Sequence, residues 1–360
     1  MLILGVETSC DETAAALIEV ADQRRQDADS RRILSNIISS QIKIHQKYRG
    51  IVPEVAARAH FEKILPVIKE AIAEIKNLEK IDLIAVTHGP GLITSLLVGL
   101  EAAKTLSYLF KKPLIPVNHL EGHIYANWLS SSITDSQLSQ NKIFPAVCLI
   151  VSGGHTELLL MKDYGRYQRL GGTRDDAAGE CFDKVARLLN LGYPGGPVIE
   201  DCASKFKNSL FKINLPRPMI NQKNFDFSFS GLKTAVLYKM KASLKDPVPR
   251  EFIKSLAAET QESIVDVLIF KTIKVAKRFS AKSVILSGGV AANQRLRDRM
   301  KEEAEKIGKI FLVPPKNFCT DNAAMIAMAG YFNYRLLNPK QKNKLLHNWQ
   351  KIEADPNLML

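Results

Sequence analysis

Short apolar runs alternate with longer helical patterns along the whole chain, and this alternation predicts an α/β fold. In the first third of the chain, the apolar runs predict strands at residues 2–6, 14–20, 33–41, 81–87 and 113–117. Between them, helical patterns predict helices at residues 55–75 and 95–109. The first of these helices is expected to begin near Pro53 and to be kinked or interrupted at Pro66.

The same order of elements begins again after a polar, serine-rich segment at residues 130–141, which is the best linker candidate in the chain. Strands expected at residues 147–151 and 156–162 enclose a glycine turn, as the first two strands enclose a small polar turn. The later segment SVILSGGVAANQRLRDRM repeats the strand, glycine turn and helix order of LIAVTHGPGLITSLLVGLEAAKTL. We therefore predict two homologous lobes, at residues 1–133 and 142–338, with a cleft between them. A basic tail follows at residues 339–360.

The charge balance of the chain favours a polyanionic partner. The 360 residues include 50 Lys and Arg against 37 Asp and Glu, which leaves a net charge of +13. Such a surplus is typical of nucleic-acid binding, although solubility alone also accounts for it.

The 5 cysteines are scattered singly, which argues against a disulfide framework and favours a reducing cytoplasm. The N-terminal segment lacks the positive flank of a signal peptide, and the apolar stretch 92–110 contains Glu101 and Lys104, so no membrane span is predicted.

Three small polar or glycine-rich turns each follow an expected strand: ETSCDET (7–13), SGGHTE (152–157) and SGGVAAN (287–293). Glycine at such a turn lets backbone N–H groups approach a phosphate, because no Cβ stands in the way. A single turn of this kind is usually only a turn, but three at matching places in two lobes indicate a nucleotide site in the cleft. A Walker A loop is absent, because Ile310 follows the Gly308–Lys309 pair.

His119 and His123, in the run HLEGH, are four residues apart and would share one face of a helix, where both imidazoles can bind one metal ion. An isolated pair of this kind is more often incidental. Glu121 would lie about 200° around the helix from His119, so it is badly placed to act as the base of a metallopeptidase. Asp321, in FCTDNAAM, is a candidate third ligand, and its alternative role is the N-cap of the last helix.

An acidic segment precedes and begins another expected helix. Asp175, Asp176 and Glu180 fit the positive end of a helix dipole. Asp183 lies a turn further in, and in a cleft it could accept hydrogen bonds from ligand hydroxyls. The nearby run YPGGP predicts a rigid turn that brings backbone close to a ligand, and the alternating phenylalanines of residues 225–229 predict a strand with one buried face.

Taken together, these motifs resemble the universal tRNA threonylcarbamoyladenosine transferase family. The motifs, in chain order, are ETSCDET, GPGL, VNHLEGH, VSGGHTEL, DDAAGE-FDK, YPGGP, FSFSGLKT, SGGVAAN and FCTDNAAM. The resemblance covers about residues 1–335, and the departures are a charged insertion near residues 21–32 and the basic tail. It implies a duplicated actin/Hsp70-like ATPase fold of the ribonuclease H-like type, with a nucleotide cleft between two lobes, in a cytoplasmic enzyme.

The resemblance also implies the site residues. The implied metal ligands are His119, His123 and Asp321, and the expected metal is Fe²⁺, with Zn²⁺ also suited to two imidazoles and a carboxylate. The implied contacts to substrate or to an ATP- or AMP-type nucleotide are Ile150, Val151, Ser152, Gly153, Gly154, Asp183, Gly196 and Asn293. Weaker candidates for the same contacts are Glu200, Glu7, Ser9 and His155.

The implied reaction transfers a threonylcarbamoyl group from threonylcarbamoyl-AMP to N6 of the adenosine adjacent to the anticodon, in tRNAs that read codons beginning with A. AMP is a good leaving group, so positioning and charge stabilisation suffice and no covalent nucleophile is expected. The implied partners are tRNA, an inactive paralogue that dimerises with the chain, a small P-loop ATPase and the synthase that makes the adenylate, with no membrane. The basic residues considered for tRNA contact, against a solvated helix face, are Lys233, Arg250, Lys274, Lys277, Arg295, Arg297 and Arg299.

Three other functions compete with this interpretation. A metallopeptidase would need a base beside the metal, which the HLEGH spacing does not supply. A kinase or ATPase of the same fold would hold Mg²⁺ mainly through carboxylates and substrate phosphates. A scaffold would bind nucleotide without turnover.

Overall fold

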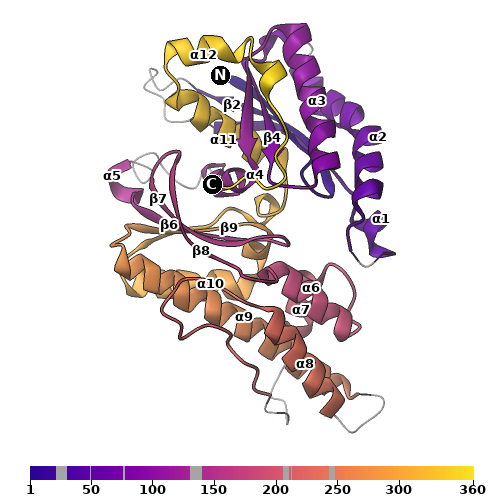
Figure 1. Cartoon of the computed structure of the whole chain (residues 1–360), viewed down its shortest axis with the longest axis vertical. Coiled ribbons are helices and arrows are strands. Elements are labelled where there is room, and N and C mark those ends of the chain that lie inside the picture. The colour runs from indigo at the N-terminus through magenta and orange to yellow at the C-terminus, as the bar shows by residue number, and fades with distance from the viewer. Residues whose placement is uncertain are drawn as a thin grey trace. The chain divides into compact units, whose positions relative to one another are not determined.

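The computed structural model describes residues 1–21, 31–48, 50–75, 78–129, 140–205, 211, 213–242 and 248–360. The charged insertion expected near 21–32 and the linker expected at 130–141 lie almost entirely outside the described residues. The chain forms two compact units (Figure 1). Unit 1 comprises Met1–Lys142, Tyr164–Arg166 and Pro314–Leu360, and unit 2 comprises Ile143–Asp163 and Tyr167–Val313.

Unit 1 is built on a five-stranded sheet in the order β3-β2-β1-β4-β5. Its strands are β1 (Leu2–Glu7), β2 (Glu12–Val20), β3 (Arg31–Ser40), β4 (Leu83–Gly89) and β5 (Leu114–Asn118). β1 runs antiparallel to β2 and parallel to β4, which in turn runs parallel to β5. Each expected strand of this half is therefore confirmed, with ends that differ by a few residues.

Helices cover both faces of this sheet. They are α1 (Ile42–Gln46), α2 (Pro53–Ala71), α3 (Ile93–Phe110), α4 (His119–Tyr125), α11 (Ala323–Leu336) and α12 (Pro339–Leu345), and the short α5 (Gln140–Ile143) lies at the end of the first segment. Leu4 and Val6 face α2 and α3 in the main apolar core, whereas α11 packs on the opposite face. At Gly5, an added Cβ would lie 2.2 Å from the carbonyl oxygen of Ala323, so glycine is what lets α11 approach the sheet.

Two predictions about these helices are settled by the structure. α2 begins with Pro53 at its first turn, as expected, but it continues through Pro66 as one helix and is not interrupted there. α3 is the one described helix that is long and apolar enough to cross a membrane by length and composition, a property that core helices share. One face of α3 packs against α2 and β4 in unit 1, and 33% of its residues are buried.

Unit 2 repeats the topology of unit 1. Its sheet has the order β10-β9-β6-β7-β8, with β6 (Ala146–Val151), β7 (Thr156–Asp163), β8 (Arg166–Gly172), β9 (Ser283–Ser287) and β10 (Ile310–Leu312). β6 pairs antiparallel with β7 and parallel with β9, as β1 pairs with β2 and β4. The duplicated α/β fold is thus confirmed, while the expected cleft between the lobes stays a prediction.

The helices of unit 2 are α6 (Ala178–Leu188), α7 (Gly195–Ser204), α8 (Ser230–Ala242), α9 (Arg250–Arg278) and α10 (Gln294–Lys306). The strand expected at residues 225–229 does not form, apart from an isolated bridge between Phe227 and Thr173. Both Phe227 and Phe229 are buried. The buried ammonium of Lys271 donates a hydrogen bond to the carbonyl oxygen of Asp226 in the same segment. The two backbone hydrogen bonds of this bridge, to Gly172 and from Arg174, together with side-chain contacts, therefore hold the segment where the sequence pattern predicted a strand.

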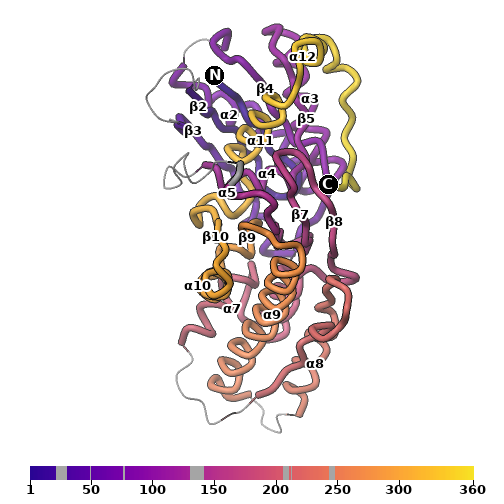
Figure 2. Tube along the Cα trace, turned by 90° about the vertical axis from the view of Figure 1, so that its left-hand side faces the viewer, coloured from indigo at the N-terminus to yellow at the C-terminus, as the bar shows by residue number. Residues whose placement is uncertain are grey.

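The last residues of the chain form a strap on unit 1, which Figure 2 shows in yellow. The ring of Trp349 lies 5.4 Å from that of Tyr108 on α3, and the Asp355 N–H donates to the carbonyl of His88 at 2.8 Å. Residues 314–360 therefore belong with unit 1, whereas the sequence pattern placed residues up to 338 in the second lobe and left 339–360 as a tail.

Candidate metal centre and nucleotide site

The candidate metal ligands are held by two helices of unit 1. α4 begins directly after β5, and the Asn118 side chain caps it by accepting a hydrogen bond from the Leu120 N–H. This places His119 and His123 on one buried face of α4. Asp321 precedes α11, but the N-cap of that helix is Asn322, which accepts from the Met325 N–H. Asp321 is therefore not the helix cap, and its carboxylate is left to face the histidines.

The three side chains lie close enough to bind one ion. Nε2 of His119 and Nε2 of His123 lie 3.5 Å and 3.2 Å from Oδ1 of Asp321, and all candidate ligand atoms lie within 4.8 Å of one another. His123 is fully buried, and neither of its ring nitrogens has a well-aligned hydrogen-bond partner among the described residues. A buried nitrogen without such a partner, beside a carboxylate, fits a metal ligand. Two imidazoles and one carboxylate suit Fe²⁺ or Zn²⁺.

The protonation of these groups follows from burial and from their mutual charges. Burial alone would lower the pKa of His119, but Asp321 and Glu7 outweigh it and hold that pKa well above the usual value. Burial lowers the pKa of His123. Burial works against the charge on Asp321, yet the neighbouring His119 keeps the pKa of this carboxyl below its usual range. Without metal, His119 is therefore the protonated member of the site at neutral pH.

Metal binding is expected to release a proton, because a ligating imidazole must be neutral while His119 is protonated in the metal-free site. Below the raised pKa of His119, Zn²⁺ affinity should rise by about tenfold per pH unit and level off above it. Calorimetric titration in buffers of different ionisation enthalpy measures the proton directly. Zn²⁺ affinity that stays constant from pH 6 to 8 would contradict this assignment.

Glu121 lies on α4 between the two histidines in the sequence, and its carboxylate bonds to α11. Its Oε2 accepts a hydrogen bond of 2.7 Å from Nδ2 of Asn333 on α11. The helix therefore turns this carboxylate away from His119 and His123, as the spacing indicated. The metal site thus has no peptidase-like base from α4, which counts against the metallopeptidase alternative.

Behind His119 lies a polar group that the sequence pointed to only indirectly. Oε2 of Glu7 and Oγ of Ser9 each lie 3.1 Å from Nδ1 of His119. The Thr87 hydroxyl, at the end of β4, donates to the same Glu7 oxygen at 2.5 Å. Glu7 and Ser9 were expected as weaker nucleotide contacts, and the structure places them against a candidate metal ligand. Thr87 was missed, and its only signal is its position just before the GPGL turn.

The first predicted nucleotide contacts of unit 2 lie partly in a buried strand and partly in the turn that follows it. Ile150 and Val151 are buried in β6. The turn that follows is closed by two hydrogen bonds, from the Ser152 N–H to the His155 carbonyl at 2.8 Å and from the His155 N–H to Oγ of Ser152 at 3.1 Å. At the exposed Gly153 and Gly154, an added Cβ would meet no atom within 4 Å. This turn is open to a ligand.

The second glycine turn of unit 2 lies against the first. Gly288 has φ +91°, and a Cβ there would lie 2.3 Å from the carbonyl oxygen of Val151. Only glycine fits both this backbone conformation and this contact. Asn293, at the end of the turn, caps α10 by accepting from the Leu296 N–H, and its Nδ2 donates to Gln261 at 2.8 Å. Asn293 is therefore the N-cap of α10 as well as a predicted nucleotide contact.

The carboxylates near this turn also bind helix N-termini. Oδ1 of Asp183 accepts from the N–H of Gly195, the first residue of α7, at 2.6 Å. Oε1 of Glu200 accepts from the N–H of Gln294 at the start of α10, at 2.7 Å. Gly196 has open space around it. These hydrogen bonds thus join the middle of α6 to the start of α7, and the middle of α7 to the start of α10.

Asp175 does not act on the helix that the sequence suggested. It lies before α6, and its carboxylate instead accepts hydrogen bonds from the start of α8. The donors are the Ser228 hydroxyl, the Phe229 N–H, and both the N–H and hydroxyl of Ser230. The predicted interaction of Asp175 with the dipole of the following helix is therefore wrong. Its carboxylate instead connects the FSFSG segment to the end of β8.

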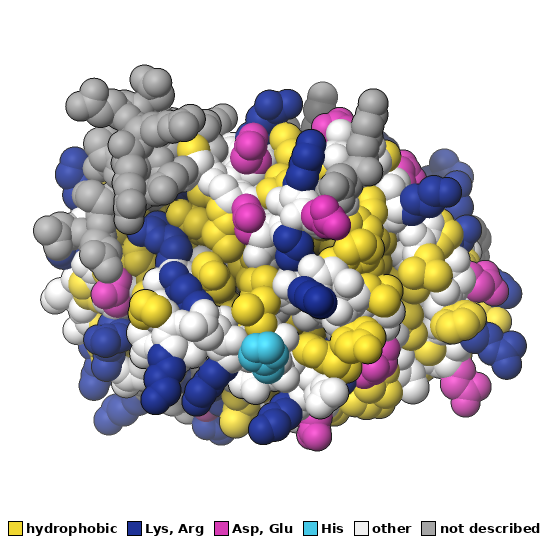
Figure 3. Space-filling view, turned by 90° about the horizontal axis from the view of Figure 1, so that it is seen from above, with side chains coloured by type: hydrophobic (Ala, Val, Ile, Leu, Met, Phe, Trp, Pro, Cys, Tyr) yellow, Lys and Arg dark blue, Asp and Glu magenta, His cyan; other side chains and the backbone are white. Residues whose placement is uncertain are grey.

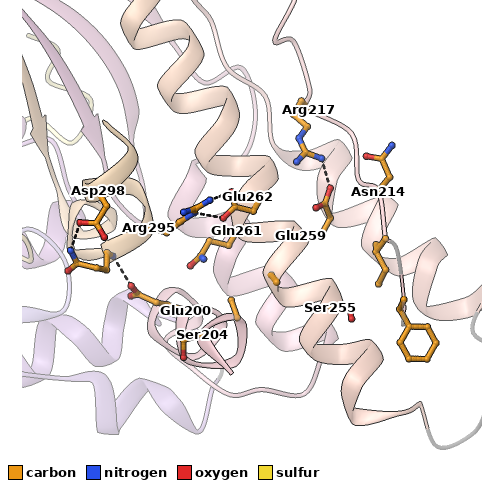
Figure 4. A pocket seen from close by; sticks show the side chains of 15 residues that line it. Glu200, Ser204, Asn214, Arg217, Ser255, Glu259, Gln261, Glu262, Arg295 and Asp298 are labelled. Atoms are coloured by element: carbon orange, nitrogen blue, oxygen red, sulfur yellow. Dashed lines mark hydrogen bonds and ion pairs between the residues drawn. The ribbon is translucent and has the colours of Figure 1, made fainter. Parts of the chain in front are cut away.

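A pocket of about 1120 Å³ opens in unit 2 among α7, α9 and α10, with the predicted contact Glu200 in its lining (Figure 4). Its lining residues include Glu200, Ser204, Phe211, Arg217, Gln261, Gln294, Arg295 and Asp298. Arg295 pairs with Glu262 at 2.7 Å, and Arg217 pairs with Glu259 and, at 2.9 Å, with Asp266. These ion pairs hold the arginines on the wall of the pocket.

The same ion pairs bear on the predicted tRNA contacts. Arg295 and Arg299 both pair with Glu262, and Arg299 also pairs with Asp266 at 2.6 Å. Arg297 donates to the carbonyl of Ala291 at 2.9 Å. These three α10 arginines are therefore engaged within unit 2. Many other Lys and Arg side chains remain on the surface, as the face in Figure 3 shows.

Comparison with solved structures identifies the fold. Full-length HypF, in its phosphate- and nucleotide-bound form, superposes with a TM-score of 0.57 at 14% identity, over 94% of this chain and 56% of that one. HypF from T. kodakarensis gives a TM-score of 0.54 at 15% identity, over 92% of this chain and 46% of that one. At these identities the likeness shows the fold alone, which is the expected actin/Hsp70-like type.

Comparison of sequences identifies the family. Residues 32–328 match the family described as tRNA N6-adenosine threonylcarbamoyltransferase. Proteins of that name are 48% identical in Thermosipho africanus, over the whole of both chains, and 52% identical in Thermodesulfovibrio yellowstonii, over 92% of this chain and 94% of that one. A third, from Thermomicrobium roseum, is 50% identical over 92% of each chain. The chain therefore belongs to the tRNA N6-adenosine threonylcarbamoyltransferase family.

Proposed function

We propose that this chain transfers the threonylcarbamoyl group of threonylcarbamoyl-AMP to N6 of the adenosine adjacent to the anticodon of tRNA. The observation that carries the proposal is the family match over residues 32–328, with near-complete coverage of relatives that bear this name. The enzyme is thus an acyltransferase, and we place it in the cytoplasm with its tRNA substrate.

His119, His123 and Asp321 would hold one metal ion, with Fe²⁺ as the first candidate and Zn²⁺ as the second. A bound ion of either kind supplies Lewis-acid stabilisation to phosphate oxygens. His123 is fully buried while the neighbouring Asp321 is partly exposed, so the site is closed to water on the side of His123. The protein's own contribution is to hold the donor in place while the amine attacks.

The thiols of the chain fit a mechanism without a covalent intermediate. Burial raises the pKa of Cys181 to about 12, and it also raises the pKa of Cys148. Burial raises the pKa of Cys10 well above its usual value, with Asp11 adding to the effect. A thiol that stays protonated is a poor nucleophile. The activated donor and the amine can react directly, because AMP leaves readily.

For the nucleotide part of the donor, we propose that the open turn Ser152–Gly154 and the pocket beside Glu200 in unit 2 form the binding region. The turn exposes two glycines, which allows backbone N–H groups to approach a phosphate. Asp183 on α6 and Glu200 on α7 each bond to the start of a neighbouring helix, and their carboxylates are the proposed acceptors for ribose hydroxyls. The proposed ligand is an AMP- or ATP-type nucleotide.

Asp183→Asn tests this assignment. A hydrogen bond to a charged group contributes roughly 1.5–3 kcal/mol, so AMP binding should weaken by roughly tenfold to a hundredfold. The melting temperature should also fall somewhat, because the carboxylate accepts from the Gly195 N–H. The matched control is Asp201→Asn, since Asp201 lies exposed on α7 and pairs with Lys205. If Asp183→Asn and Asn293→Ala lower the melting temperature but leave AMP affinity intact, both residues are structural.

We propose the same helpers that the resemblance implied: an inactive paralogue, a small P-loop ATPase and the synthase that supplies the adenylate. The functional alternatives are separated by one assay of AMP release. A transferase should release AMP from the donor in proportion to added tRNA. Release that is independent of tRNA, or cleavage of protein substrates in its absence, would contradict the proposal.

A further inference from the structure

Glu7 is a fully buried carboxylate at the end of β1, and both of its oxygens are occupied. Oε1 accepts from the Ser9 N–H at 2.5 Å, and Oε2 accepts from the Thr87 hydroxyl at 2.5 Å. Among the described residues, no Lys or Arg forms an ion pair with it, and its one ionic partner is His119. A buried carboxylate is costly unless it is paired, so His119 is the group that makes Glu7 tolerable at this position.

The contact with Glu7 decides which nitrogen of His119 faces the metal site. Nδ1 lies 3.1 Å from Oε2 of Glu7, whereas Nε2 lies 3.5 Å from Asp321. A carboxylate accepts and cannot donate, so it holds the imidazole with its proton on Nδ1. A metal ion would displace the proton that Nε2 carries in the metal-free site, and the lone pair of Nε2 would then be available beside Asp321. His123 has no comparable partner for its Nδ1 among the described residues.

The fold explains how these groups meet. β1, β4 and β5 are adjacent and parallel, so their carboxyl ends lie along one edge of the sheet. Glu7 ends β1, Thr87 lies near the end of β4, and His119 directly follows β5. Each residue reaches the site from a different strand, and rigid strand ends hold the carboxylate, the hydroxyl and the imidazole in fixed order.

We infer that Glu7 is a positioning residue of the metal centre: it fixes the tautomer and orientation of His119 and thereby sets metal affinity. This inference rests on the proposed metal site. A carboxylate behind a ligating histidine increases the basicity of the ligand, and loss of such a partner typically costs tenfold to a hundredfold in metal affinity. Thr87 supports the arrangement by fixing the carboxylate in turn.

The test is Zn²⁺ affinity of Glu7→Gln, measured by competition with a chelating dye, together with the visible spectrum of the Co²⁺-loaded protein. An amide can accept through only one atom, so it cannot serve the Ser9 N–H, Thr87 and His119 together. We expect Zn²⁺ binding to weaken by about tenfold to a hundredfold. The ligand-field bands of Co²⁺ should also shift, which a merely structural change elsewhere would not cause.

Glu121→Gln is the matched control, because Glu121 is also a buried carboxylate beside the histidines but contacts Asn333. It should leave Zn²⁺ affinity and the Co²⁺ spectrum unchanged. Unchanged Zn²⁺ affinity in a folded Glu7→Gln protein, or an equal loss in Glu121→Gln, would overturn the inference. If Glu7→Gln fails to fold, Thr87→Val is the second test. We expect a smaller loss of Zn²⁺ affinity in this variant, and no loss at all would overturn the inference. His123→Ala in parallel shows whether the metal site itself is wrong, because this change removes a proposed ligand and leaves the contact between Glu7 and His119 in place.

Discussion

His123→Ala is expected to remove most bound metal and most transferase activity. His123 is fully buried, and its ring nitrogens have no well-aligned partner among the described residues, so the site has no substitute for this ligand. Loss of one of three protein ligands leaves an imidazole and a carboxylate, which hold a divalent ion far more weakly. Metal content after dialysis and Zn²⁺ titration measure the effect directly.

The matched control is His45→Ala. His45 is also buried in unit 1, but its ring is hydrogen-bonded to Gln41 and lies on α1, away from the metal ligands. This variant should retain full metal occupancy even if it melts at a lower temperature. Full occupancy in His123→Ala would show that the three residues are not a metal site.

The second large effect is expected from salt. Phosphate contacts release counterions from a polyanion, so tRNA affinity should fall log-linearly with salt concentration. With about 6–10 phosphate contacts, affinity should fall by about 10³–10⁵ between 50 and 200 mM salt. The net charge of +13 and the basic surface support contacts of this kind. Fluorescence anisotropy with labelled tRNA gives the slope.

The basic residues outside the α10 ion pairs are the ones to replace. Lys233→Gln, Arg250→Gln and Lys277→Gln together should reduce the slope by about one unit for each side chain that contacts a phosphate. Arg295 and Arg299 pair with acidic residues, so they should contribute less. AMP affinity over the same salt range is the control. Unchanged tRNA affinity across this range would mean that the basic surplus has another purpose.

The duplicated fold was predictable because its signals are local and periodic. Apolar runs of strand length and helical patterns occur twice in the same order, and each lobe has the same sheet topology. The spacing of His119 and His123 likewise placed both rings on one helix face, which the structure shows. The sequence also indicated that Glu121 lies on a different side of the helix from His119, since helix geometry determines this.

What the sequence could not show depends on contacts between distant segments. Residues 225–229 alternate like a strand, yet Lys271 on α9 and Asp175 before α6 hold this segment without a ladder. Asp321 and Asn322 are both good capping residues, and only the structure shows that Asn322 takes that role. The packing of the last residues around His88 involves backbone groups, which no side-chain pattern reveals.

The most direct test of the transfer reaction uses purified protein loaded with Fe²⁺ or Zn²⁺, the helper proteins, threonylcarbamoyl-AMP and a tRNA that reads codons beginning with A. The tRNA is then digested, and its nucleosides are separated by mass. We expect threonylcarbamoyladenosine from the intact tRNA, AMP in equal amount, and no modified nucleoside from a tRNA in which guanosine replaces the adenosine next to the anticodon. Absence of the modified nucleoside with all components present, in a protein that binds both metal and tRNA, would contradict the proposed function.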